Sequence, residues 1–244
     1  GCNVPAIMAT RTIESRSSRL ITVLLVPFMS CSARIPIYIL LIGTFFAAYA
    51  SWVMLGLYLL GIVVAVITAR LMRRYLFKKD ETPFVMELPN YRMPGAKNVC
   101  QLLWEKSKDF LQRAFTVIFA ATIVIWFLQS FDTRLDVVTS SEQSLLAMVG
   151  RWLAPIFAPL GFADWRCATA LITGFIAKES VVSTLQILLG TAAISTLFTA
   201  KAALSFLVFT LLYTPCVAAI AAIRRETGSA LRAALIALSQ CCIA

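Results

Sequence analysis

Three cysteines lie close to prolines in largely apolar parts of the sequence. A proline inside a helix lacks a backbone N–H and leaves the carbonyl oxygen four residues earlier without its partner. Thiolates and such carbonyl oxygens together form a mixed ligand set that suits a borderline divalent metal such as Fe²⁺. Taken singly, each cysteine is more simply explained as a small buried side chain. The pairs are Cys2 with Pro5, Cys31 with Pro27, and Cys216 with Pro215.

The carbonyl groups freed at these breaks need other partners, because lipid offers none. The carbonyls predicted to lose their helical partners are those of Val23, Ser32 and Leu211, four residues before Pro27, Pro36 and Pro215. Arg34 is a candidate to bind the carbonyl groups of its own broken helix. Asn3 is either a further ligand or the cap of a helix.

Lys178 and Glu179 are two ionisable residues within the apolar stretch 168–189. A charge at the centre of a membrane helix costs about 2.5–3.5 kcal/mol, so such residues usually mark a transport path. We expect Glu179 to attract a cation and Lys178 to hold it in place or to compensate its charge when the site is empty. The alternative is a helix end at the membrane interface, where both side chains reach water.

The composition requires a membrane environment for the elements that carry these residues. Of the 244 residues, 60% are hydrophobic and only 14% are charged, whereas a soluble domain has roughly a quarter charged residues. Several apolar stretches reach the roughly 18–20 residues needed to cross a bilayer. We therefore predict an all-α, polytopic transmembrane helical bundle with broken helices. The apolar stretches are 20–29, 37–49, 52–69, 115–128, 168–189 and 202–223.

The net charge of +10 is concentrated in short basic clusters beside apolar segments. Such clusters mark cytoplasmic loops in membrane proteins, so we expect no nucleic-acid partner. They lie at 11–19, 70–79 and 224–232, whereas the connection 132–142 is acidic and is predicted to be external.

The two halves of the sequence share a weak pattern, in which a glycine-led polar break precedes a cysteine beside a proline. Paired interruptions of this kind are typical of transporters built from repeats. We assign residues 1–78 to a first repeat and a following transmembrane helix, and 165–244 to a second repeat. Residues 79–113 are predicted to form a cytoplasmic loop and an amphipathic helix that lies at the membrane surface. Residues 114–164 contain a transmembrane helix, an external loop and a broken or re-entrant segment.

Residues 145–162 form that last segment, which carries Arg151, Pro155 and Pro159. We expect it to cross the membrane once, since the basic clusters then fall on one side.

Several classes of function are excluded by residues that the sequence lacks. It contains no histidine, and its seven cysteines resemble no disulfide framework, so we expect free thiols. No phosphate-binding loop, nucleophile elbow or dinucleotide-binding motif occurs in it. We therefore expect a transporter or another membrane protein and not an enzyme.

Five motifs resemble the bacterial ferrous-iron transporter B family. They are GCNVPAIMATRT at 1–12, PFMSCSAR at 27–34, ELP with YR-x-P at 87–94, GFIAKE at 174–179 and YTPC at 213–216. The first motif is long and specific, and the resemblance extends from one end of the sequence to the other.

The resemblance implies uptake of Fe²⁺ across the bacterial inner membrane, driven or regulated by an amino-terminal GTP-binding domain. That domain has no counterpart in this sequence, so we expect an internal piece of a longer protein in which GTP and Mg²⁺ bind elsewhere. Fe²⁺ is expected as the transported substrate and not as a permanent cofactor. Expected partners are the lipid bilayer, the GTP-binding domain, small cytoplasmic accessory proteins and further copies in a homo-oligomer.

Carried over position by position, the resemblance implies two sets of residues. The metal and transport path is implied for Cys2, Asn3, Cys31, Glu179 and Cys216, and the gate motifs for Gly1, Pro5, Gly174, Lys178 and Pro215.

Two other functions stay open at this point. A permease for organic solutes such as nucleosides would share the gate architecture, but it would need aromatic and amide side chains at the breaks. A membrane scaffold or regulatory subunit would use the cysteines for packing and Lys178 and Glu179 for docking. The sequence also leaves open whether transport is channel-like or uses alternating access.

Overall fold

A computed structural model describes most of the chain as a bundle of helices. In the described residues the only pairing of extended segments is an isolated bridge between Phe131 and Val137, and the predicted all-α architecture is confirmed. Gly1 and most of the predicted motif at 87–94 lie outside the described residues. The described residues are 2–13, 15–75, 93, 95–132, 134, 136–138, 141–189 and 194–244.

The first repeat contains a broken helix that is long and apolar enough, from Arg16 to Phe45, to cross a membrane. Pro27 lies in η2, two residues after the end of α2, as predicted for a break. Pro36 occupies the first turn of α3, where no backbone N–H is needed, so the prediction that it interrupts a helix is wrong. The elements are α1 (Asn3–Ala9), η1 (Thr10–Thr12), α2 (Arg16–Leu25), η2 (Val26–Phe28), η3 (Ser32–Arg34) and α3 (Ile35–Phe45).

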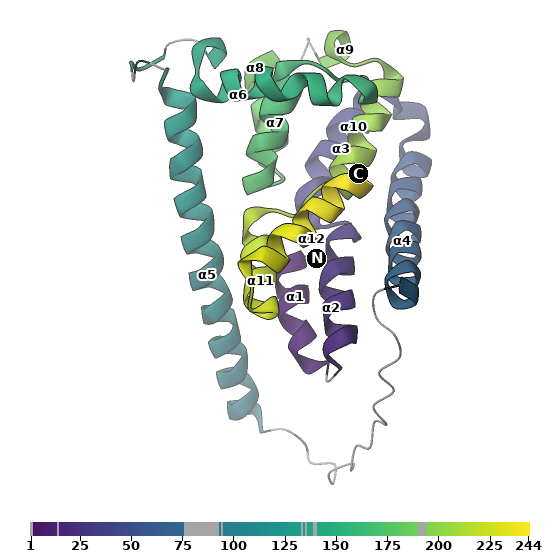
Figure 1. Ribbon diagram of the computed structural model, residues 1–244, viewed down its shortest axis with the longest axis vertical. Coiled ribbons are helices and arrows are strands. Elements are labelled where there is room, and N and C mark those ends of the chain that lie inside the picture. Colours follow the sequence, from purple (N-terminus) through teal and green to yellow (C-terminus); the bar gives the residue numbers. More distant parts are fainter. Residues whose placement is uncertain are drawn as a thin grey trace.

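Two long helices follow. After η4 (Ala47–Tyr49), α4 (Ala50–Tyr75) contains the predicted spanning segment. The next helix, α5 (Ala96–Ser130), is continuous over 35 residues, so the prediction of a separate helix at the membrane surface is wrong. At 1.5 Å per residue α5 is about 50 Å long, which exceeds a hydrocarbon layer of about 30 Å. Its amphipathic start therefore extends below the bundle (Figure 1).

The segment after α5 lies across the bundle and not along it. It comprises η5 (Ser141–Gln143), α6 (Leu145–Leu153) and η6 (Ala154–Leu160), and it meets α7 (Trp165–Ile176) at an angle of 103°. Gly161 has a φ of +82° at this bend, a conformation that favours glycine. α7 is the element that turns into the bundle (Figure 1). The crossing expected for residues 145–162 stays a prediction, in which this segment and α7 together form one broken span.

The predicted second repeat, residues 165–244, begins with α7 and runs through the remaining helices. Its α10 and α11 together form a segment, Ala200–Thr227, that is long and apolar enough to cross a membrane. The elements are α8 (Ser180–Leu189), α9 (Ile194–Leu197), α10 (Ala200–Leu212), α11 (Val217–Thr227) and α12 (Ala230–Ile243).

The two repeats run in opposite directions (Figure 1). In the first, α1 descends from the middle of the bundle, α2 returns to the middle and α3 continues upward. In the second, α8 ascends from the middle, α10 returns and α11 continues downward. Inverted repeats of this kind place the broken helices of a transporter at the middle of the membrane.

The core lies where the two repeats meet, between α3 and α10. Its largest fully buried apolar side chains include those of Phe28, Tyr38, Leu41, Phe206 and Leu211. On the outer face of α4, by contrast, apolar side chains such as Trp52 and Leu59 are exposed. An exposed apolar surface of this extent is typical of a lipid-facing helix.

Candidate functional site

A cavity of about 170 Å³ lies where the broken ends of the helices meet. Four separate breaks contribute to it, namely the start of α1, the α2–α3 break, the α7–α8 break and the α10–α11 break. The residues that line it are Cys2, Asn3, Val4, Cys31, Ser32, Ala33, Ile118, Ile176, Ala177, Lys178, Glu179, Pro215, Cys216 and Ala218. We call this space the cysteine cavity.

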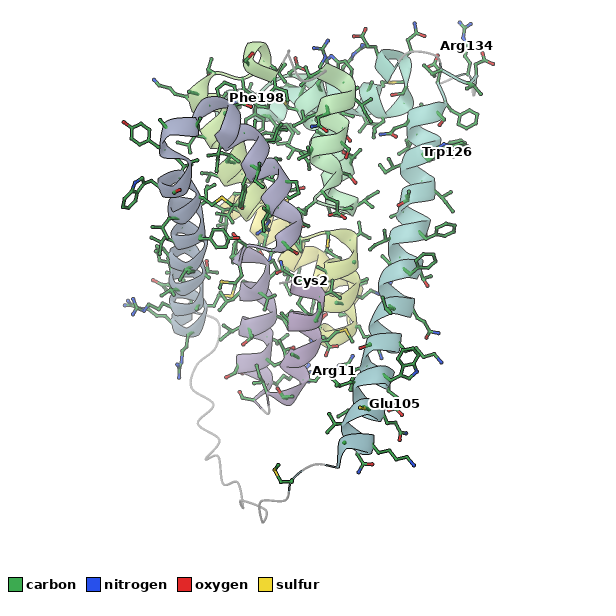
Figure 2. The ribbon with its side chains drawn as sticks, turned by 180° about the vertical axis from the view of Figure 1, so that it is seen from behind. Cys2, Arg11, Glu105, Trp126, Arg134 and Phe198 are labelled. Carbon is green, nitrogen blue, oxygen red and sulfur yellow. The ribbon has the colours of Figure 1, made fainter. Side chains whose placement is uncertain are left out.

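The three cysteines of the cavity occupy equivalent positions. Cys2 precedes α1, Cys31 precedes η3 and Cys216 precedes α11, and each is the extended N-cap residue of its helix, with ψ values of 139°, 156° and 159°. All three are free thiols, and Figure 2 shows Cys2 near the middle of the bundle. Among the described residues, no three cysteine or acidic side chains are close enough to form a closed metal site.

Two buried side chains from different repeats hold the break between α2 and α3. The guanidinium of Arg34, which is fully buried, donates to the carbonyl oxygens of Pro27 and Met29, both at 3.1 Å. Nε2 of Gln240 in α12 donates to the carbonyl oxygen of Leu24 at 3.1 Å. The prediction that Arg34 binds carbonyls of its own broken helix is confirmed, although these carbonyls are not the one of Val23.

Lys178 holds the break between α10 and α11 in a similar way. Its side chain is buried, and its Nζ donates to the carbonyl oxygen of Thr214 at 2.9 Å. The same Nζ lies 3.3 Å from the centre of the Tyr213 ring, which is within the range of a cation–π interaction. Glu179 is exposed and lines the cysteine cavity. Lys178 therefore positions the backbone that carries Cys216.

The structure gathers most of the predicted residues but not all of them. Cys2, Asn3, Cys31, Lys178, Glu179, Pro215 and Cys216 line the cysteine cavity. Pro5 is exposed on α1 and does not line it. Gly174 is buried in α7, where a Cβ atom would meet the side chain of Val181 and would lie 2.9 Å from Oη of Tyr213. Gly174 therefore allows close packing next to the site and is not part of its lining.

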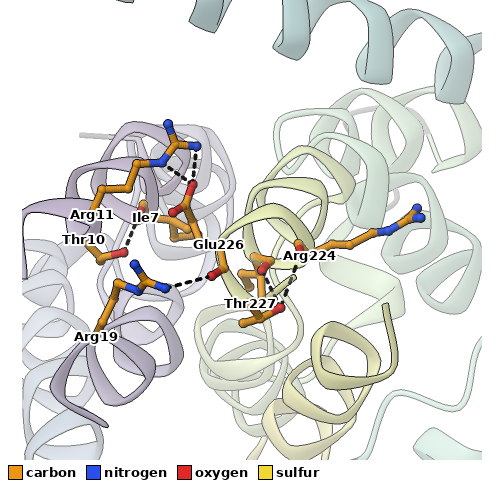
Figure 3. A network of polar contacts seen from close by, with 8 residues as sticks. Ile7, Thr10, Arg11, Arg19, Arg224, Glu226 and Thr227 are labelled. Carbon is orange, nitrogen blue, oxygen red and sulfur yellow. Dashed lines mark hydrogen bonds and ion pairs between the residues drawn. The ribbon is translucent and has the colours of Figure 1, made fainter. Parts of the chain in front are cut away.

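One polar contact between the repeats was not predicted. Nη2 of Arg11 lies 2.6 Å from Oε1 of Glu226, and Nε of the same arginine donates to that oxygen at 2.8 Å. Arg19 adds a bond of 3.5 Å to the backbone oxygen of Glu226, and Figure 3 shows both arginines reaching across to α11. The available clue was that Glu226 is the only acidic residue in the basic cluster 224–232.

Two protein families match the chain in complementary parts. The Gate family, described as nucleoside recognition, matches residues 1–45 and 111–230. A family described as ferrous iron transport protein B C terminus matches residues 54–106. No solved structure matches the chain.

Curated relatives agree with both matches. Fe(2+) transporter FeoB of Staphylococcus aureus (strain COL) is 43% identical over 235 residues, which cover 94% of this chain and 35% of the relative. Fe(2+) transporter FeoB of Methanocaldococcus jannaschii is 42% identical, covering 93% of this chain and 36% of the relative. An "Fe(2+) transport protein A/Fe(2+) transporter FeoB fusion protein" of Porphyromonas gingivalis is 40% identical, covering 93% and 33%.

The chain thus spans about a third of the length of these relatives. The Gate match covers more than half of the chain, and the second family covers most of the segment between its two parts. The chain therefore belongs to the Gate family and corresponds to the C-terminal membrane region of FeoB proteins.

Proposed function

We propose that this chain forms the Fe²⁺-translocating membrane part of a ferrous-iron uptake transporter in the bacterial inner membrane. The observation that carries the proposal is the cysteine cavity, which is lined by Cys2 and Cys31 from the first repeat and by Cys216 from the second. Intramembrane polar groups are costly, so their convergence at four helix breaks favours a transport path.

The chemistry of the lining suits Fe²⁺. Thiolates are soft ligands, and the amide of Asn3, the hydroxyl of Ser32 and the carboxylate of Glu179 add harder oxygen atoms. Such a set matches a borderline divalent metal better than Mg²⁺ or Na⁺. Several weak ligands also let the ion leave, which transport requires.

The mechanism follows from the inverted repeats. Hydrated Fe²⁺ enters from the external side and exchanges some of its water for thiol and oxygen ligands in the cysteine cavity. Arg34 and Lys178 keep the two broken helices in place, because they bind the backbone carbonyls at the breaks. Movement of one repeat against the other then opens the cavity to the cytoplasm.

Other parts of the transporter complete this account. A GTP-binding domain outside these residues drives or regulates the movement of the repeats. A small accessory protein also acts with the transporter, as the name of the Porphyromonas gingivalis fusion protein suggests.

A nucleoside permease is the second candidate, because the Gate family is described as nucleoside recognition. The cysteine cavity, at about 170 Å³, is smaller than the roughly 300–1,000 Å³ of typical small-molecule sites. Among the described residues that line it, none is aromatic. Both observations favour an ion over a nucleoside.

The test is the initial rate of anaerobic Fe²⁺ uptake in cells that express the full-length transporter. The double variant Cys31→Ser/Cys216→Ser should fall to about a tenth of the wild-type rate or less, at an equal amount of protein in the membrane. Cys100→Ser, which changes an exposed thiol on α5, is the matched control and should stay within about twofold. An unchanged rate in the double variant would refute the assignment of these ligands, and uptake of a labelled nucleoside would support the permease.

A further inference from the structure

A second cavity, of about 440 Å³, adjoins the cysteine cavity and is lined by residues of α1, α5 and α11. The two cavities share Val4 and Ala218. Most of the residues that line the second cavity are apolar, and its polar side chains are those of Gln112, Thr116, Arg225 and Glu226. We call this space the lower cavity.

The lower cavity leads toward the basic end of the bundle. Cys216 caps α11 at the cysteine cavity, and Glu226 lies ten residues further along, which is about 15 Å at the rise of an α-helix. In the first repeat, α1 and η1 likewise lead from Cys2 to Arg11 (Figure 2). Basic clusters mark the cytoplasmic end of membrane helices, so this end faces the cytoplasm.

Glu226 is unusual at this position because its side chain is only 4% exposed, whereas that of Arg11 is 40% exposed. Among the described residues that line the lower cavity, it is the only one with a carboxylate. A buried carboxylate needs a positive partner. In this conformation that partner is Arg11, which joins the first repeat to the second (Figure 3).

We propose that Glu226 is a cation-binding residue of the cytoplasmic exit and that Arg11 occupies its carboxylate while the exit is closed. This inference rests on the proposed function. A divalent cation that leaves the cysteine cavity through the lower cavity meets this carboxylate and displaces the guanidinium, which is exposed enough to turn into water. The ion pair between η1 and α11 is then broken, and the exit opens.

The test compares single and paired variants by their initial rates of Fe²⁺ uptake in proteoliposomes that contain the full-length transporter. Glu226→Gln keeps the size and the hydrogen-bonding oxygen but removes the charge, and it should lower the rate at least about tenfold. Glu105→Gln, an exposed carboxylate on α5, is the matched control and should stay within about twofold.

The charge-swapped pair Arg11→Glu/Glu226→Arg separates cation binding from a purely structural tie. It restores an ion pair but moves the carboxylate from the lower cavity to η1, so its rate should stay as low as that of Glu226→Gln. Recovery of the wild-type rate in the swapped pair would overturn the inference, as would a normal rate in Glu226→Gln. If Glu226→Gln does not reach the membrane, the swapped pair alone decides.

The same experiment distinguishes the inference from the proposed function. If Cys31→Ser/Cys216→Ser loses uptake while Glu226→Gln keeps it, the cysteine cavity remains the transport path and the inference about the exit fails. If the cysteine variant keeps wild-type uptake, the proposed function itself fails.

Discussion

The ammonium group of Lys178 lies 3.3 Å from the centre of the Tyr213 ring and donates to the carbonyl oxygen of Thr214. This contact joins the α7–α8 break to the α10–α11 break. The two residues that follow Lys178 and Thr214, Glu179 and Pro215, both line the cysteine cavity. The shape of the cavity therefore depends on a buried lysine whose Nζ binds the backbone.

Lys178→Met should impair transport by releasing the α10–α11 break. An unpaired buried carbonyl at Thr214 costs about 1–3 kcal/mol, which corresponds to about a 5- to 160-fold lower uptake rate if the transporting state carries that cost. Tyr213→Phe is the matched control, because the ring stays and its Oη has no hydrogen-bond partner among the described residues. It should stay within about twofold of wild type. Equal losses in both variants would contradict this role of Lys178.

Arg34→Met should destabilise the protein because it leaves the carbonyl groups of Pro27 and Met29 buried without partners. The expected loss is about 2–6 kcal/mol, from about 1–3 kcal/mol for each group. Arg34→Lys should recover only part of the stability. A lysine ammonium restores a positive donor, but it cannot present the two-pronged geometry with which the guanidinium binds both carbonyls. The midpoint of thermal unfolding in detergent compares the stability of the two Arg34 variants with that of the wild type. Arg232→Met, which changes an exposed side chain on α12, is the control and should leave the midpoint unchanged.

Gly174→Ala should disturb the packing of α7 against α8 and Tyr213. The new Cβ would meet the Val181 side chain and would lie 2.9 Å from Oη of Tyr213, and such overpacking costs about 1–3 kcal/mol. Gly56→Ala in α4 is the control, because nothing lies within 4 Å of its Cβ position. It should be neutral or stabilising by up to about 1 kcal/mol. A melting temperature that falls equally in both variants would contradict this account.

The cysteine cavity could largely be predicted from sequence. A proline or a charged residue in an apolar stretch is locally visible, and it demands a break and a partner in lipid. Arg34 and Lys178 both bind carbonyl oxygens at the breaks. These are the carbonyls of Pro27 and Met29 for Arg34 and the carbonyl of Thr214 for Lys178, and none of them lies four residues before a proline of the break. The sequence could not indicate which carbonyl is bound, because that depends on where the helix ends and on what packs beside it.

Contacts between segments that are distant in the sequence could not be predicted. Arg11 and Glu226 are 215 residues apart, and only the packing of α1 against α11 brings them together. The change in polarity near Arg113 predicts a boundary, but α5 continues through it. Residues 96–130 contain neither glycine nor proline, so nothing in the backbone ends the helix there.

The bend after α6 has local signals in the sequence. Pro155, Pro159 and Gly161 all fall within seven residues, and a glycine that follows prolines is a common end to a helix. Arg151 also fits a position of α6 at the end of the bundle. Its side chain donates to the carbonyl oxygen of Glu142 and lies over the Trp165 ring.

The central claim is that Fe²⁺ occupies the cysteine cavity, and metal protection of its thiols tests this most directly. The full-length transporter in liposomes would be alkylated under anaerobic conditions with and without Fe²⁺, and the modification of each cysteine would be quantified by mass spectrometry. We predict that Fe²⁺ slows the alkylation of Cys31 and Cys216 by at least about tenfold and leaves that of exposed Cys100 unchanged. Equal rates at Cys31 and Cys216 with and without Fe²⁺ would contradict the account.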